Sequence, residues 1–132
     1  MSKYMTFDSQ SFPNRDLLLE ALAECGFASP MVGTDIPLEG WDKRNPQTAD
    51  IVIRRRDVPG QTLLGDIGFQ RTSKGYVAII DDMDLSYRLG KDFVIRLQNS
   101  YHEAVARKMA KRLGGTLIKE RVGKTLKIRI KY

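Results

Sequence analysis

The sequence predicts an α+β fold: a mostly antiparallel sheet with two helices on one face, in the order β-α-β-β-β-α-β-β. Two observations carry this prediction. Two segments repeat apolar residues every three or four positions, as helices do. The other apolar segments are short, alternate with polar residues and are separated by turn-forming residues. Helices then cover one side of the sheet, and a chain of 132 residues suits a single domain over residues 1–132.

The N-terminal part is predicted to form a short strand at residues 4–7 and then a helix. Asn14 is a suitable N-cap for this helix, and Gly26 lies just past its end. Leu18 and Cys25 recur at helical spacing on what becomes the core face. Cys25 is therefore more typical of a small core residue than of a nucleophile.

Residues 29–48 form the least regular stretch and hold three prolines, two glycines and the only tryptophan, Trp41. An edge strand is expected around residues 36–38. A connection of this length is unusual in a compact domain and is often functional. Two alternatives stay open: a binding loop, or a loop that Trp41 pins to the core as a hydrophobic plug.

Three strands are predicted in the middle of the chain, at residues 49–56, 63–71 and 76–81. The last two are expected to form a hairpin across residues 72–75, which end in glycine. Arg54, Arg55 and Arg56 do not make one phosphate-binding patch, because consecutive side chains of a strand point to opposite faces. Gly65 and Gly68 fall inside the second strand and indicate a bulge or a close approach by another part of the structure.

The C-terminal part is predicted as a long helix at residues 92–113, ended by two glycines, and a hairpin of residues 116–122 and 125–132. Tyr101 falls on the apolar stripe of this helix. The hairpin turns at Gly123 and Lys124, and a two-residue loop places Glu120 opposite Lys127.

Positive charge is concentrated at the C-terminal end. The chain has 22 Lys and Arg against 16 Asp and Glu, and residues 107–132 hold ten of the cations against one acid, Glu120. A cationic face of this kind suits an acidic protein or the phosphates of nucleic acid. The alternative is a solvated face with cations at a helix C-terminus. The candidate anion-binding residues are Arg107, Lys111, Lys127, Arg129 and Lys131.

Most catalytic classes find no support in the sequence. Glycine-rich phosphate loops and the Gly-x-Ser-x-Gly elbow are absent. One cysteine, one histidine and no long apolar run give no basis for a zinc site, a cofactor or a membrane span. Asp66, Asp81, Asp82 and Asp84 could gather at one end of the sheet, but a solvated turn is the more usual outcome and no metal is predicted.

Tyr101 and His102 are the remaining candidates for chemistry. The Tyr101 ring is expected to pack, with its hydroxyl group on a partner. His102 lies at the border of the apolar stripe and is the best single acid–base candidate, because histidine titrates near neutral pH. A lone helix histidine is more often structural or exposed, so enzymatic activity stays open and is not favoured.

Five short pieces of sequence resemble a known family. They are Gly40-Trp41, residues 48–53, the run from Asp66 to Phe69, residues 76–81 and Tyr101-His102. In order and spacing they resemble the conserved hypothetical chloroplast reading-frame thirty-five family, a domain of unknown function. The connection around residues 56–64 is longer here, and the C-terminal part is more basic. The resemblance implies a fold and no mechanism, and it singles out Trp41, Asp66, Gly68, Tyr101 and His102.

Three hypotheses follow for a protein that we expect to be cytoplasmic. The first is a binding or adaptor module that meets an acidic protein or nucleic-acid phosphates through its basic C-terminal face or its Trp41 loop. The second is an enzyme or small-molecule-binding domain, in which Tyr101, His102 and Asp66 or Asp81 converge on a pocket. The third is a structural subunit that pairs through a sheet edge or through the Trp41 loop.

Overall fold

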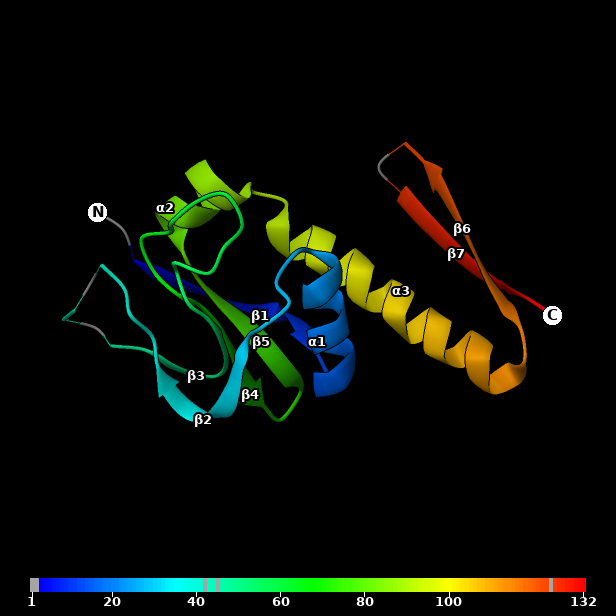
Figure 1. Ribbon diagram of the computed structural model, residues 1–132, viewed down its shortest axis with the longest axis horizontal. Coiled ribbons are helices and arrows are strands. Elements are labelled where there is room, and N and C mark those ends of the chain that lie inside the picture. Colours follow the sequence, from blue (N-terminus) through cyan, green and yellow to red (C-terminus); the bar gives the residue numbers. More distant parts are fainter. Residues whose placement is uncertain (1–2, 42, 45, 124) are drawn as a thin grey trace.

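The computed structural model describes residues 3–132 except 42, 45 and 124, and it has the predicted α+β architecture (Figure 1). Five strands form one antiparallel sheet in the order β1-β5-β4-β3-β2, and two more form a separate two-stranded sheet. The strands are β1 (Tyr4–Phe12), β2 (Met31–Pro37), β3 (Thr48–Ile53), β4 (Ile67–Thr72), β5 (Gly75–Asp81), β6 (Thr116–Val122) and β7 (Thr125–Lys131). The helices are α1 (Arg15–Glu24), α2 (Asp82–Asp84), the single-turn π-helix η1 (Leu85–Leu89) and α3 (Phe93–Leu113).

The main core lies between one face of the five-stranded sheet and the two longer helices. Apolar residues of α1 and α3, such as Leu22 and Leu97, pack with Ile51, Phe69 and Ile80 from the strands. The other face carries a smaller cluster in which Leu38, Ala49, Val52 and Ile79 are buried together. The prediction of helices on one face is therefore confirmed, and the second face is partly covered by the loop that follows β2.

The helix ends follow the predicted signals. The Asn14 side chain accepts a hydrogen bond from Leu17 N at the start of α1, as an N-cap does. At the end of α3, Gly114 adopts a left-handed conformation, φ 70°, which glycine takes without strain. The C-terminal hairpin has the predicted register, with Glu120 opposite Lys127. Its loop residue Lys124 lies outside the described residues.

Several strand predictions were wrong in their limits. β1 extends to Phe12, and β2 begins at Met31, far before the short edge strand that we expected. β3 ends at Ile53, and two residues later the backbone N–H of Arg55 donates to the Asp66 carboxylate instead of to a neighbouring strand. β4 begins only at Ile67, so Gly65 precedes the strand.

The short helices α2 and η1 were not predicted, and the hairpin between β4 and β5 is tighter than expected. Thr72 pairs with Gly75, which leaves two residues in the loop. Among the described residues, no helix combines the length and the apolar character that crossing a bilayer requires.

Candidate functional site

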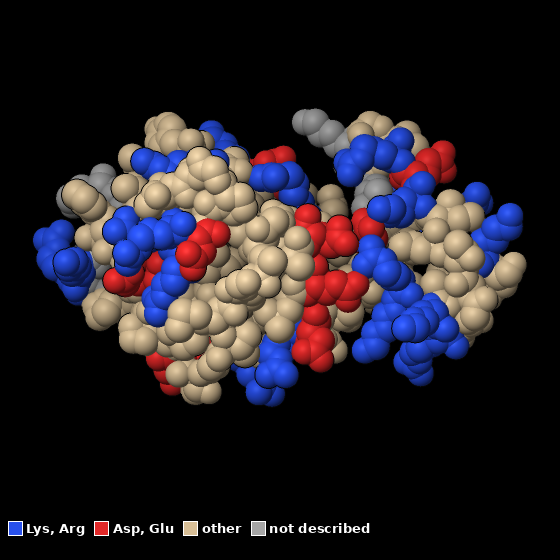
Figure 2. Space-filling view, viewed as in Figure 1, with Lys and Arg blue, Asp and Glu red and all other residues tan. Residues whose placement is uncertain are grey.

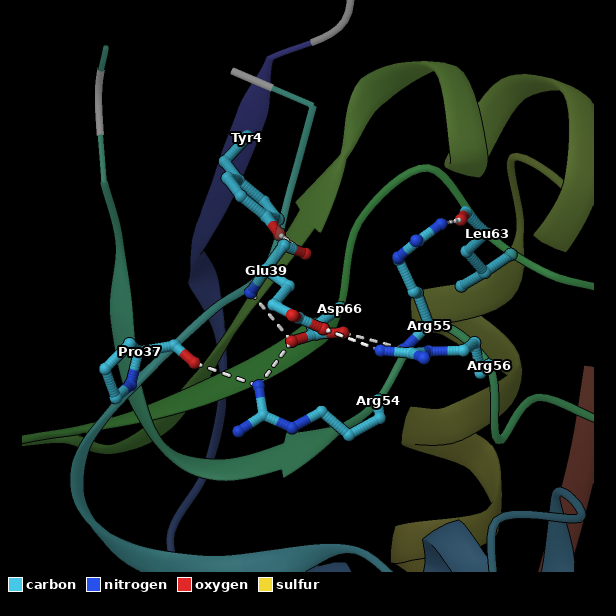
Figure 3. A network of polar contacts seen from close by, with 8 residues as sticks. All are labelled: Tyr4, Pro37, Glu39, Arg54, Arg55, Arg56, Leu63 and Asp66. Carbon is cyan, nitrogen blue, oxygen red and sulfur yellow. Dashed lines mark hydrogen bonds and ion pairs between the residues drawn. The ribbon is translucent and has the colours of Figure 1, made fainter. Parts of the chain in front are cut away.

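The connection between β2 and β3, residues 38–47, is called the Trp41 loop. Asp66 is the centre of a polar network at the base of this loop (Figure 3). It lies just before β4 and is completely buried. Its carboxylate accepts hydrogen bonds from Glu39 N at 2.8 Å and Arg55 N at 2.7 Å, and the Arg54 guanidinium lies at 2.6 Å. Burying a carboxylate is tolerated when such partners replace water. The candidate ligand residue Asp66 thus binds other parts of its own chain.

The arginine cluster is divided as the sequence predicted, and two of its guanidinium groups hold the same loop. Arg54 also donates to Pro37 O at 3.0 Å, and Arg56 pairs with the Glu39 carboxylate at 3.4 Å (Figure 3). The Arg55 side chain donates to Leu63 O at 3.4 Å. The three side chains therefore have different partners, with Arg54 and Arg56 beside Pro37 and Glu39 and Arg55 on Leu63.

Tyr4 closes this network from the first strand. Its hydroxyl group donates a hydrogen bond to Glu39 O at 3.1 Å. Burial raises the pKa of Tyr4 far above its ordinary value, and the nearby Asp66, Asp81 and Asp84 raise it further, so the hydroxyl group keeps its proton. A Cβ atom at Gly40 or Gly65 would lie 2.7 or 2.6 Å from this oxygen, so both positions need glycine.

Gly68 allows Leu38 to reach the sheet. A Cβ atom at Gly68 would lie 2.9 Å from Leu38 Cδ1 and 2.8 Å from Ala49 Cβ. The close approach that the sequence indicated at this glycine is therefore made by the chain's own loop. Gly68 positions the loop rather than contacting an outside molecule.

Trp41 is 69% exposed and does not plug the core. Leu38, three residues earlier, takes that role, which overturns the plug alternative for Trp41. The indole ring instead borders a hollow of about 610 Å³. The described residues that line it are Leu38, Glu39, Gly40, Trp41, Lys43, Pro46, Arg55 and Leu64. The loop thus offers an open aromatic surface on a fixed base.

The acidic side chains at the end of β5 and just after it accept hydrogen bonds from backbone N–H groups. Asp81 accepts from the N–H groups of Met83 and Asp84 and so caps α2. Asp84 is fully buried and accepts from Leu64 N at 2.9 Å and Gly65 N at 3.0 Å. Burial raises the pKa of Asp84.

Asp82 accepts from Lys3 N at 2.9 Å, so it too serves the backbone. Within the described part of the chain, no group of three His, Cys, Asp or Glu side chains is arranged to hold a metal ion.

Tyr101 and His102 lie apart from this network. Tyr101 is buried, its ring meets Phe12 edge-on at 5.4 Å, and its hydroxyl group accepts from Asn14 N at 3.0 Å. His102 is exposed on α3. The structure therefore brings Tyr101 to the start of α1 and does not bring it, or His102, to Asp66 or Asp81.

The C-terminal arm, defined as residues 107–132, carries the predicted basic face. Figure 2 shows Lys and Arg side chains gathered over this end of the molecule, beside a band of acidic side chains. Arg107 forms ion pairs with Glu20 at 2.7 Å and Glu103 at 2.9 Å, and Lys119 binds Glu103 at 2.7 Å. These ion pairs hold the base of the arm. Among the described side chains, Arg107 is therefore already paired within the chain, unlike the other candidate anion-binding residues.

The remaining candidate cations of the arm are exposed. Lys127, Arg129 and Lys131 alternate along β7 and so lie on one side of the hairpin. Lys111 is exposed on the last turn of α3. Among the side chains that the structure describes, none of these four forms an ion pair. The side of the hairpin that carries the three β7 cations also carries Glu120, which lies opposite Lys127.

A cleft of about 1020 Å³ lies where the arm approaches the rest of the molecule. Its lining includes Phe27, Val58 and Phe93 from the body and Arg121 from the hairpin. No local pattern of residues predicts this cleft, because its walls come from segments far apart in the chain.

The comparisons with known proteins give one match. A family model described as a protein of unknown function (DUF1257) matches residues 21–130. No curated protein and no solved structure matches the chain.

Proposed function

The chain belongs to the DUF1257 family of proteins of unknown function, and on that premise we propose from its own residues that it is a binding module. The C-terminal arm is its main binding surface, and the partner is an anionic macromolecule. We also propose that the protein is related to the chloroplast reading-frame thirty-five family and that it is located in the cytoplasm.

The observation that carries this proposal is the separation of the arm from the five-stranded sheet. β6 and β7 pair only with each other and contact the rest of the described structure through α3 (Figure 1). Of the side chains in these two strands that the structure describes, none belongs to the buried clusters of the body. The hairpin carries three exposed cations on one side and lies outside these clusters. These features favour binding of a partner molecule over a role in the core.

Nucleic-acid phosphate is the partner class that the arm fits best. A two-stranded β-ribbon has the dimensions to enter the major groove of DNA, and cations on one side of it can neutralise successive phosphates. Tyr132 is the arm's only aromatic residue, so stacking contributes little and binding is expected to be independent of base sequence. An acidic protein is the alternative partner.

The test is binding to a short DNA duplex at several salt concentrations. The variant Lys127→Glu, Arg129→Glu, Lys131→Glu is compared with Arg71→Glu, Lys74→Glu, Lys91→Glu, which makes the same charge change at exposed cations of the body. The arm variant should bind far more weakly, and its salt dependence should fall by about one phosphate contact for each cation removed.

The control variant should bind the duplex nearly as the wild type does. Equal loss in both variants would show that net charge alone governs binding and would contradict the role of the arm. Displacement of the duplex by an equal amount of polyglutamate would favour the acidic-protein alternative.

A further inference from the structure

We propose that the hollow beside Trp41 binds a nucleotide unit, with the base stacked on the indole ring and the phosphate held by Lys43 and Arg55. This site is separate from the arm and does not depend on the arm's function. The same chemistry is offered by a free nucleotide and by a nucleotide within a strand.

The base of the loop is fixed before any ligand arrives. The backbone of Glu39 makes three hydrogen bonds: its N–H donates to Asp66, and its carbonyl accepts from Asp66 N at 2.8 Å and from the Tyr4 hydroxyl group (Figure 3). Leu38 N donates to Gln47 O at 2.9 Å and so ties the two sides of the loop together. Trp41 follows this fixed base by two residues.

The size and lining of the hollow suit a small ligand. Its volume of about 610 Å³ is within the range of small-molecule sites. Leu38, Pro46 and Leu64 supply apolar surface, and Lys43 and Arg55 supply positive charge. The acid among the described lining residues, Glu39, is paired with Arg56. The hollow therefore favours an anion that also has an apolar face.

A nucleotide satisfies both halves of this chemistry. An indole ring stacks on any nucleobase, and cations beside it hold a phosphate. An acidic peptide would meet the cations but would leave the exposed ring without a planar partner. A neutral aromatic compound would cover the ring but would leave the cations unused.

Trp41 is the only tryptophan, so its fluorescence reports directly on the site. The full chain is titrated with AMP, adenosine, ribose 5-phosphate and a short oligoadenylate. AMP, the oligoadenylate or both should quench the emission to saturation. Adenosine and ribose 5-phosphate should bind on the order of tenfold more weakly than the quenching nucleotide, because each lacks one of the two groups. Comparing the affinities for AMP and for the oligoadenylate then shows whether the site prefers a free nucleotide or a nucleotide within a strand.

The variant Lys43→Ala keeps the fluorescent reporter and should weaken binding by about tenfold, as expected for loss of a charged contact. Lys74→Ala, at an exposed lysine of the β4–β5 loop, is the matched control and should bind as the wild type does. For Trp41 itself, anisotropy of a fluorescent AMP analogue should show lost binding in Trp41→Ala, and Tyr87→Ala should have no effect. Tyr87 is a suitable control because it is 76% exposed and lies outside the hollow.

The proposal is overturned if no nucleotide quenches Trp41 to saturation, or if Lys43→Ala and Lys74→Ala behave alike. It is also overturned if an acidic peptide quenches as strongly as the nucleotide. Lys127→Glu in the arm should leave AMP affinity unchanged. This variant separates a failure of the hollow from a failure of the arm.

Discussion

Asp66 ties three segments together because its carboxylate binds the backbone of residues 39 and 55 and the side chain of Arg54. The residue is completely buried, so each of these donors replaces water that an exposed aspartate would keep. Removing one partner from such a buried pair typically costs about 3–5 kcal/mol. At the scale of single residues, Asp66 therefore holds the base of the loop that carries Trp41.

Asp84 gives a pH-dependent prediction at the same scale. Burial raises its pKa, so the folded protein keeps a proton that the unfolded chain releases at lower pH. The stability that this group contributes is present in full below its pKa in the unfolded chain and is lost as pH rises through its pKa in the folded state. The free energy of unfolding of the wild type should therefore fall relative to that of Asp84→Asn, which has no titratable group at this position, as pH rises from acid toward neutral.

Urea denaturation across a pH series measures this difference. Ser86→Ala, which changes an exposed side chain of the next turn and no titratable group, is the control. A wild type that gains stability relative to Asp84→Asn as pH rises toward neutral would contradict the assignment.

At the scale of elements, Tyr101 couples the two main helices. Its ring packs in the core from α3, and its hydroxyl group accepts from Asn14 N, the N–H group of the α1 N-cap residue. One end of α1 is thus held by its own cap and by a side chain from α3, which comes after all five strands of the sheet in the chain.

Tyr101→Phe removes this contact and leaves the ring in place. It should lower the free energy of unfolding by about 1 kcal/mol, the usual net value of one hydrogen bond. Urea denaturation at neutral pH is the measurement. Tyr87→Phe, at an exposed tyrosine for which the structure shows no side-chain contact, is the control, and equal loss in both variants would contradict the coupling.

The whole molecule consists of a body with two clusters on opposite faces of one sheet and an arm that belongs to neither cluster. The arm continues from the earlier turns of α3, and ion pairs join its Arg107 and Lys119 to Glu20 and Glu103 of the body. These side chains are about half exposed, and such pairs contribute little to stability. The body should therefore fold without the hairpin.

Deletion of residues 115–132 tests this division. The shortened chain should keep a cooperative thermal transition, with a lower midpoint because apolar residues at the end of α3, such as Ala110, become exposed. It should also lose binding to the DNA duplex. Calorimetry measures the first effect, and a chain that no longer unfolds cooperatively would show that the arm is part of the core.

The sequence by itself determined the local structure of this protein. Apolar periodicity predicted α1 and α3, and glycines and Asn14 predicted where helices end or begin. The two-residue turn predicted the pairing of Glu120 with Lys127. These features depend on residues within a few positions of one another, so a single chain reveals them.

Only the tertiary structure decided what the singled-out residues do. Leu38 covers the sheet while Trp41 is exposed, and Leu38 lies so close to Gly68 that a side chain there would collide with it. Asp66 is bound by partners 11 to 27 positions away, and the hairpin stands apart from the sheet. Long-range packing decides which side chains are buried and which residues they contact. Residue types and their spacing in the sequence do not determine either property.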